Sequence, residues 1–248
     1  MRILVSNDDG VHSPGLHALA RTAQRYGDVR VVAPDVEQSA MSHAITIRRP
    51  LHYVATKVDG LEAYRVDGTP ADCVALGTHH WDRVDLVLTG INLGLNIGHN
   101  IWHSGTVAAA KQASFLGIPA VALSAPSSDE VPIDYDALAP WVAKAIEAFQ
   151  DLPDVPLLNV NFPEGEPKGM RWTRMSVRHY EGLVIPGEDP MGRRHYWFSE
   201  RPRERVEEET DRWAIENGYV SLTPLRLNLT DDRALGAIWD ARGEKATD

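Results

Sequence analysis

The sequence predicts an α/β protein with a three-layer core and a mostly parallel sheet, because short apolar runs alternate with helical segments. Five runs rich in apolar and β-branched residues recur along the chain: Arg2–Ser6, Val29–Ala33, Asp85–Leu88, Pro119–Leu123 and Pro156–Val160. Strands that are apolar along most of their length are buried on both faces, which is typical of a parallel sheet covered by helices. We therefore expect one central sheet with helices on each side.

Helical segments with recognisable ends lie between most of these runs. Ser13 and Pro14 supply an N-cap residue followed by proline in the first turn, and Gly27 is expected to close that helix about four turns later. A second helix is expected from Thr106 to Phe115. A third, Asp136–Phe149, places apolar residues on one face at helical spacing.

An insertion at residues 46–66 is expected to fold as a β-hairpin. Leu51–Ala55 and Glu62–Val66 have strand-like composition. They flank Asp59-Gly60, a residue pair favoured in tight hairpin turns.

The pattern changes in the last third of the chain. Residues 164–218 are rich in Arg, Glu, Trp and Gly and have few regular apolar stretches. We interpret them as an extended arm or β-excursion that is ordered by contact with another subunit. A strand at Ser221–Leu229 and a helix at Asp231–Trp239 are expected to follow. Residues 1–163 are thus predicted to form the core, and residues 164–248 a C-terminal oligomerisation arm within one overall domain.

The composition restricts the classes of partner. The chain carries 25 Lys and Arg residues against 35 Asp and Glu residues, a formal net charge of −10. Non-specific nucleic-acid binding depends on Lys and Arg neutralising phosphates, so a long polynucleotide is not expected as a partner. A small phosphorylated ligand remains open, because a local cation can reverse the effect of an acidic surface.

The sequence also indicates a compartment. Cys73 is the only cysteine, so no internal disulfide can form, which fits a reducing environment. The N-terminus begins with a strand-like run without the features of a signal peptide, and no apolar run approaches the ~18 residues that suggest a membrane span. We expect a soluble, cytoplasmic protein with no membrane partner.

Polar clusters follow four of the predicted strands, the fourth of which ends in Ser124-Ala125-Pro126, and ligands bind at such strand ends in open parallel sheets. Asp8 and Asp9 follow the first strand, Ser39 the second and Asn92 the third. Adjacent carboxylates repel each other unless they are solvated or neutralised by a cation. Oxygen ligands without Cys or His suit Mg²⁺, Mn²⁺ or Ca²⁺ rather than zinc. The alternative is a simple turn in which the aspartates cap the following helix.

A second cluster is suited to an anion. Residues 90–98 form a glycine-spaced loop, and Ser104, Gly105 and Thr106 stand at the start of the second predicted helix. Helix N-termini with small residues offer backbone N–H groups to a phosphate, and we expect the Thr106 hydroxyl to point toward such a ligand. The alternative is an ordinary loop in which Ser104 or Thr106 is the N-cap. The loop matches neither a Walker motif nor a dinucleotide fingerprint.

Four ordered clusters resemble the SurE family of stationary-phase survival nucleotidases. They are Ile3–Gly10, Ala33-Pro34 with Gln38-Ser39 and Ser42, Gly68–Val74, and Gly90-Ile91-Asn92 through Ser104-Gly105-Thr106. The resemblance covers residues 1–126 strongly and continues more weakly to about residue 225. It implies a Rossmann-like core, dimers or tetramers, and divalent-metal-dependent hydrolysis of nucleoside 5′- and 3′-monophosphates, with short polyphosphate as a further substrate.

The resemblance also implies roles for individual residues. Asp8, Asp9, Ser39 and Asn92 match the ligands of one divalent cation per subunit, for which Mg²⁺ or Mn²⁺ is expected. Asn96 and Ser104-Gly105-Thr106 match the phosphate-side loop. Thr89, and Trp102-His103 before Ser104, depart from the family pattern, which bears on substrate preference rather than on the reaction.

The expected mechanism is metal-assisted hydrolysis of a phosphomonoester, in which Asp8 or Asp9 acts as base or nucleophile. The sequence does not decide which. Two other readings remain. One is a phosphatase of the haloacid dehalogenase type with an aspartyl-phosphate intermediate, although that family has Asp-x-Asp where this chain has adjacent aspartates. The other is a non-catalytic nucleotide or metal sensor that uses the same pocket.

Overall fold

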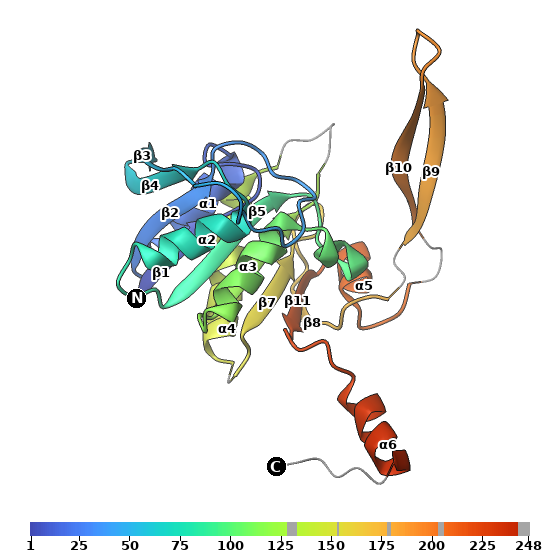
Figure 1. Cartoon of the computed structure of the whole chain (residues 1–248). Helices are drawn as coiled ribbons and strands as arrows, with labels where there is room; N and C mark the ends of the chain where they lie inside the picture. Colours follow the sequence, from blue (N-terminus) through green and yellow to red (C-terminus); the bar gives the residue numbers. More distant parts are fainter. Residues whose placement is uncertain (128–132, 153, 178–179, 203–205, 243–248) are drawn as a thin grey trace.

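The fold is a nine-stranded, mostly parallel sheet between two layers of helices (Figure 1). It was obtained as a computed structural model, which describes residues 1–127, 133–152, 154–177, 180–202 and 206–242. The strand order is β3-β4-β2-β1-β5-β6-β7-β11-β8. The predicted α/β three-layer class is therefore confirmed.

The middle of the sheet consists of the five strands that the apolar runs predicted, and all five run parallel. They are β1 (Arg2–Ser6), β2 (Asp28–Pro34), β5 (Leu86–Leu93), β6 (Ala120–Ala125) and β7 (Leu157–Asn161). β1 pairs with β2 on one side and with β5 on the other. The chain therefore winds outward in both directions from β1 and β5. Such a reversal leaves a crevice at the carboxyl ends of the two strands, where open α/β sheets bind ligands.

The predicted insertion is a β-hairpin at one edge of this sheet. β3 (Tyr53–Val58) and β4 (Leu61–Val66) pair antiparallel, and β4 pairs parallel with β2. Asp59 and Gly60 both have positive φ angles, of 50° and 81°. Positive φ at both central residues is the geometry that Asp-Gly turns favour in two-residue hairpins.

The other edge of the sheet comes from the last third of the chain. β11 (Val220–Leu225) pairs antiparallel with β7 and parallel with β8 (Met170–Trp172). The central sheet thus continues past residue 163, and the two proposed regions share it. β11 ends at Leu225 rather than at residue 229, because it pairs with β7 only as far as Leu225.

Two helices cover each face of the sheet. α1 (Pro14–Ala23) and α4 (Tyr135–Gln150) pack on one apolar cluster, and α2 (Pro70–His79) and α3 (Gly105–Phe115) pack on the other. Among the described residues, no helix has the length and apolar character needed to cross a bilayer.

Gly27 does not have the capping role predicted for it, because α1 ends four residues earlier. The chain leaves α1 in tight turns, in which Arg25 and Tyr26 donate backbone hydrogen bonds to Thr22 and Ala23. Gly27 is instead required by close packing. A Cβ atom at this position would lie 1.9 Å from the backbone oxygen of Met1.

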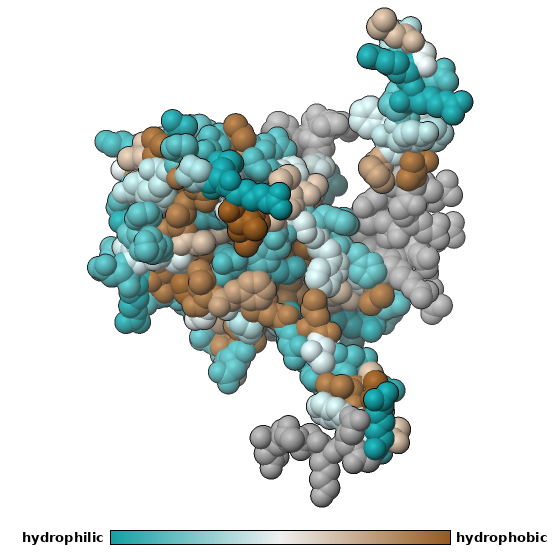
Figure 2. Space-filling view, viewed as in Figure 1, coloured by the Kyte–Doolittle hydropathy of each residue, from teal (hydrophilic) through white to brown (hydrophobic). Residues whose placement is uncertain are grey.

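The predicted arm contains more regular structure than its composition suggested. β9 (Tyr180–Glu188) and β10 (Arg194–Pro202) form a separate two-stranded antiparallel sheet that projects from the body (Figure 1). It is followed by the short helix α5 (Asp211–Glu216), and α6 (Asp232–Arg242) ends the described chain without a buried residue. Among the coloured residues of the hairpin in Figure 2, hydrophobic ones lie at the end away from the tip.

Candidate active site

The predicted polar clusters meet at the carboxyl ends of β1, β2 and β5. The turn after β1 contains Gly10 at a φ of 97°, and the next residue, Val11, donates its backbone N–H to the carbonyl of Pro34 at the end of β2 (2.8 Å). Gln38, farther along, donates its backbone N–H to the carbonyl of Asp8 (2.7 Å). These two bonds join the loop after β2 to the loop after β1.

Asp8 lies at the N-terminus of α3. Its side chain is buried, with 4% of its surface exposed. One carboxylate oxygen accepts the backbone N–H of Thr106 (3.0 Å), and the other accepts the Thr106 hydroxyl. Burial raises the pKa of Asp8, while the hydrogen bonds from Thr106 act in the opposite direction. The positive end of the helix dipole also favours a carboxylate here.

Gly105 allows this close approach. A Cβ atom at Gly105 would lie 2.8 Å from the Cβ atom of Asp8 and equally near one of its carboxylate oxygens. The structure also changes the expectation for Thr106. Its hydroxyl and its N–H both donate to Asp8, so they do not point into open solvent where an anion would dock. Thr106 therefore acts on the carboxylate in this structure.

Asp9 is more accessible than its neighbour and is held differently. Its carboxylate accepts the backbone N–H of Leu93 at the end of β5 (3.3 Å). Burial raises the pKa of Asp9 to about 7, and the negative charges of Asp8 and Glu37 add to this effect. Two desolvated carboxylates in adjacent positions make the ionised state costly unless a cation neutralises them.

Ser39 lies in the loop after β2, and Asn92 lies at the carboxyl end of β5. Ser39 is exposed and follows Gln38, which binds Asp8; its hydroxyl donates to the carboxylate of Glu37 (2.6 Å). Asn92 precedes Leu93, which binds Asp9. The amide nitrogen of Asn92 donates to the Gly94 carbonyl (2.6 Å), so this bond does not use the side-chain oxygen that would bind a cation.

Asn96 and Ser104 are both buried near the same edge. The side-chain nitrogen of Asn96 donates to the hydroxyl of Ser124 on β6 (2.8 Å). Ser104 is the N-cap of α3, and its hydroxyl accepts the backbone N–H of Val107 (3.0 Å). Between them lies the short 3₁₀ helix η1 (Gly98–Trp102).

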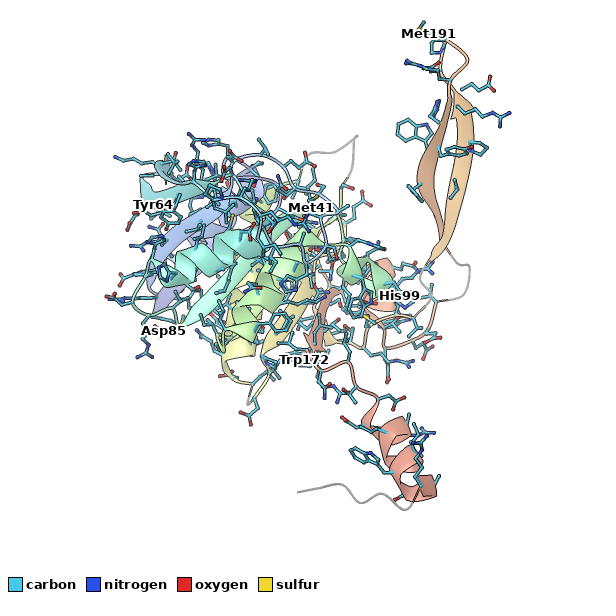
Figure 3. The ribbon with its side chains drawn as sticks, in the orientation of Figure 1. Met41, Tyr64, Asp85, His99, Trp172 and Met191 are labelled. Atoms are coloured by element: carbon cyan, nitrogen blue, oxygen red, sulfur yellow. The ribbon has the colours of Figure 1, made fainter. Side chains whose placement is uncertain are left out.

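The loop after β2 is attached to the start of α3 as well. Ser42 donates its backbone N–H to the His103 carbonyl (3.0 Å) and its hydroxyl to the Trp102 carbonyl (2.6 Å). Figure 3 shows Met41 of this loop on the same side of the molecule as α3, and His99 of η1 near α5. Hydrogen bonds therefore connect the loop after β2 both to the loop after β1 and to the residues that precede α3.

The residues present fit a hard divalent cation. Among the described residues, no group of three or more His, Cys, Asp and Glu side chains could hold a metal ion. A cation at this edge would therefore depend on the two aspartates together with neutral oxygens, such as those of Ser39 and Asn92. Carboxylate, hydroxyl and amide oxygens are the ligands that Mg²⁺ and Mn²⁺ prefer. Burial raises the pKa of both aspartates, so their ionised forms are disfavoured unless a partner neutralises the charge.

Sequence reasoning missed two kinds of residue at this edge. Glu37 lies near Asp9 and accepts the hydroxyl of Ser39, but a single Glu in a loop gives no local signal. Asn159 and Asn161 of β7 bind the backbone of Asn96 from a distance of more than 60 positions in sequence. Polar residues in a strand that is otherwise apolar were the only available sign.

A comparison with family models matches residues 3–182 to the family described as Survival protein SurE. The resemblance inferred from the sequence is thereby confirmed.

Related proteins match along nearly the whole chain. A Thermus thermophilus protein named 5′-nucleotidase SurE 1 is 50% identical over 244 residues, which cover 96% of each chain. A Deinococcus radiodurans protein named 5′-nucleotidase SurE is 43% identical, covering 97% of this chain and 92% of the relative. The crystal structure of the SurE protein from Aquifex aeolicus superposes with a TM-score of 0.84 at 38% identity, covering 98% of this chain and all of the other.

Proposed function

The chain belongs to the SurE family, and from this premise we propose that it is a metal-dependent phosphomonoesterase that hydrolyses nucleoside 5′-monophosphates to nucleoside and phosphate. The names of its relatives support a 5′-nucleotidase. The observation that carries the proposal is the pair of desolvated aspartates, Asp8 and Asp9, at the point where the sheet reverses its winding. We extend the proposal to nucleoside 3′-monophosphates and short polyphosphate.

We assign one divalent cation per subunit, Mg²⁺ or Mn²⁺, to Asp8, Asp9, Ser39 and Asn92. The oxygen-only donor set and the raised pKa values of both aspartates support this assignment. When bound, the cation would supply Lewis-acid polarisation of the phosphoryl group.

The two aspartates have different surroundings, which suggests different roles. Both oxygens of Asp8 accept hydrogen bonds from Thr106, so Asp8 is fixed in orientation. Asp9 is more exposed and receives one backbone hydrogen bond, from Leu93. We therefore assign to Asp9 the orientation of the attacking water and the removal of its proton. Asp8, whose orientation Thr106 fixes, is assigned the role of cation ligand alone.

The phosphate side of the site is assigned to Asn96 and to Ser104, Gly105 and Thr106. These residues stand where the loop after β5 enters α3. The N–H groups of Thr106 and Val107 are used by Asp8 and Ser104, so the contribution of α3 would come from its dipole, whose positive end favours the charge that develops on the phosphoryl oxygens. Thr106 contributes through Asp8, to which its hydroxyl donates.

We place the protein in the cytoplasm as a homodimer or homotetramer that binds nucleoside monophosphates and no long nucleic acid. The net charge of −10 opposes binding to a polynucleotide. The exposed apolar residues of the projecting hairpin support an oligomer. Membership of the SurE family offers no support for an aspartyl-phosphate intermediate of the haloacid dehalogenase type.

The proposal is tested by measuring phosphate release from 5′-AMP with the metal-free protein and after addition of Mg²⁺ or Mn²⁺. We expect turnover that appears with the cation and disappears with EDTA. The same assay with 3′-AMP and tripolyphosphate tests the wider substrate range. Binding of 5′-AMP without phosphate release under any of these conditions would identify a sensor and reject the enzyme.

A further inference from the structure

Buried polar side chains from the second half of the chain form hydrogen bonds with the backbone of the loop from Gly94 to Gly98. Its central residue, Asn96, belongs to the proposed phosphate side of the site, and its last residue begins η1. Loops at such sheet edges are usually free on their outer side and are positioned by the scaffold beneath them. The contacts beneath this loop therefore decide where Asn96 lies.

Asn161, the last residue of β7, contacts the backbone of Asn96 through both ends of its side-chain amide. Its oxygen accepts the Asn96 N–H (2.8 Å), and its nitrogen donates to the Asn96 carbonyl (3.2 Å). Asn159, two residues earlier on the same strand face, donates to the same carbonyl (2.7 Å). Asn159 and Asn161 are fully buried, so their amide groups depend on these partners.

Asp211 holds the end of the loop. This carboxylate is fully buried at the first residue of α5. One of its oxygens accepts the backbone N–H of Gly98 (2.8 Å), and the other accepts the N–H of Ser176 (2.9 Å) and that of Arg212 (2.8 Å). The guanidinium of Arg212 binds Glu216 instead. Asp211 thus ties η1 to the C-terminal region through backbone amides.

We propose that Asn161 and Asp211 are positioning residues of the phosphate-side loop: they fix Asn96 and the start of η1 relative to Asp8. The path from the loop to Asp8 is short, since η1 leads into Ser104 and Gly105 and then to Thr106, which binds Asp8. The kinetic part of this inference rests on the proposed function. Its structural part, the attachment of the loop, does not.

The variant Asn161→Leu removes the two hydrogen bonds that Asn161 makes with Asn96, keeps the one from Asn159, and changes the side-chain volume little. Thr223→Val is the matched control. Thr223 is also buried and also makes two side-chain hydrogen bonds, to Thr173 and Ser221, but it contacts no residue of the loop. Because both variants lose two buried hydrogen bonds, some general loss of stability is expected in each.

Residue-resolved hydrogen exchange measures the attachment directly and needs no substrate. In Asn161→Leu we expect faster exchange of the Asn96 and Gly98 amides, with unchanged exchange in β1. In Thr223→Val these two amides should exchange as in the wild type. Unchanged protection of Asn96 in Asn161→Leu would overturn the inference.

Steady-state hydrolysis of 5′-AMP, well below the unfolding temperature, gives the second readout. A displaced loop misaligns the reacting groups, so kcat should fall about 10- to 100-fold in Asn161→Leu while KM changes much less. Thr223→Val should keep the wild-type values. Equal kinetic losses in the two variants would show a merely structural role and overturn the positioning role.

Asp211→Asn is a milder second variant for the case in which Asn161→Leu does not fold. It keeps the shape and one acceptor oxygen, so faster exchange at Gly98 and a smaller fall in kcat are expected. Wild-type exchange and wild-type kcat in this variant would remove Asp211 from the proposal. If the wild-type protein releases no phosphate from 5′-AMP, the proposed function fails, and the exchange data alone decide the attachment of the loop.

Discussion

The proposed active site at the carboxyl ends of β1, β2 and β5, here called the catalytic edge, differs from the C-terminal hairpin in which side chains are buried and which are exposed. At the edge, polar side chains are buried: Asp8 is 4% exposed and Asn96 6%. On the hairpin, apolar side chains are exposed, Trp197 by 66% and Phe198 by 90%. Most buried polar groups in proteins are hydrogen-bonded, as the side chains of Asp8 and Asn96 are here. Large apolar groups are seldom left in contact with water unless they form an interface.

This difference indicates which part of the molecule is stabilised by contacts within one chain and which part needs a second chain. The hydrogen bonds that fix Asp8 come from the same chain, from the start of α3. The hairpin has two strands, and isolated two-stranded hairpins are marginally stable at best. We therefore expect the site to be organised within each subunit, and the hairpin to depend on a second copy.

The strongest test of the catalytic edge is Asp9→Asn. This change keeps the shape of the side chain and removes the charge that would bind the cation and the oxygen that would take a proton. Phosphate release from 5′-AMP should fall by at least about 10³-fold, while urea unfolding stays cooperative. Near wild-type turnover and metal affinity in this variant would show that the cation and the proton transfer are misassigned.

Gly105→Ala tests how tightly α3 packs on Asp8. The added methyl group would lie 2.8 Å from the Asp8 side chain, so Asp8 must move. We expect kcat to fall about 10- to 100-fold and stability to fall by about 1–3 kcal/mol.

Gly236→Ala is the control for this substitution. Gly236 lies in α6 with no atom within 4 Å of the added Cβ. It should leave kcat unchanged and stabilise α6 slightly. If Gly105→Ala behaves like this control, α3 does not position Asp8.

The pH dependence of the metal-free protein tests the cost of ionising Asp9, which comes first from burial and then from the negative charges of Asp8 and Glu37. The pKa of Asp9 is raised to about 7 in the folded state, above its ordinary value. The folded state therefore binds this proton more tightly than the unfolded state, and stability falls as pH rises from about 4 to about 7. Because Asp9 is partly exposed, we expect a loss on the order of 1–2 kcal/mol, which Asp9→Asn should lack.

Urea unfolding of metal-free wild type and Asp9→Asn at pH 5 and pH 8 measures this difference. Glu37→Gln, on the exposed loop, is the control, and it should alter the loss of stability between pH 5 and pH 8 much less than Asp9→Asn does. If Asp9→Asn keeps the wild-type pH dependence of stability, Asp9 is not the group that causes it.

The smallest effect on chemistry is expected from the hairpin. The double substitution Trp197→Ser and Phe198→Ser should reduce the size of the oligomer seen by light scattering at micromolar concentration. The catalytic edge should change little, with kcat within about threefold of the wild type. Met191→Ser, at the exposed tip, is the control and should leave both properties unchanged. A wild-type protein that is monomeric and fully active would contradict the assignment of the hairpin to an interface.

Local signals predicted the fold and much of the site. The apolar runs located the five parallel strands in the middle of the sheet, and Asp59-Gly60 located the turn between β3 and β4. The polar clusters at the ends of β1, β2 and β5 were found because parallel strands end at the same edge. These features depend on neighbours in the sequence, and a single sequence displays them.

Contacts between distant residues could not be read in the same way. Thr106 looked like an anion donor, but its partner is Asp8, 98 positions away. Asn161 and Asp211 look like ordinary polar residues until the fold places them behind the loop. The β9–β10 hairpin was predicted only as an extended arm or β-excursion without strand bounds, because its sequence lacks the regular apolar pattern of a core strand.

The hairpin leaves and re-enters the body at one place. The backbone N–H of Arg174 donates to the Glu209 carbonyl (3.0 Å), and the N–H of Asp211 donates to the Arg174 carbonyl (2.9 Å). A segment whose two ends already touch can be lengthened, shortened or exchanged at little entropic cost to the remainder. Homologous enzymes could therefore diversify their quaternary architecture through this excursion while the chemistry of the sheet edge stays constant.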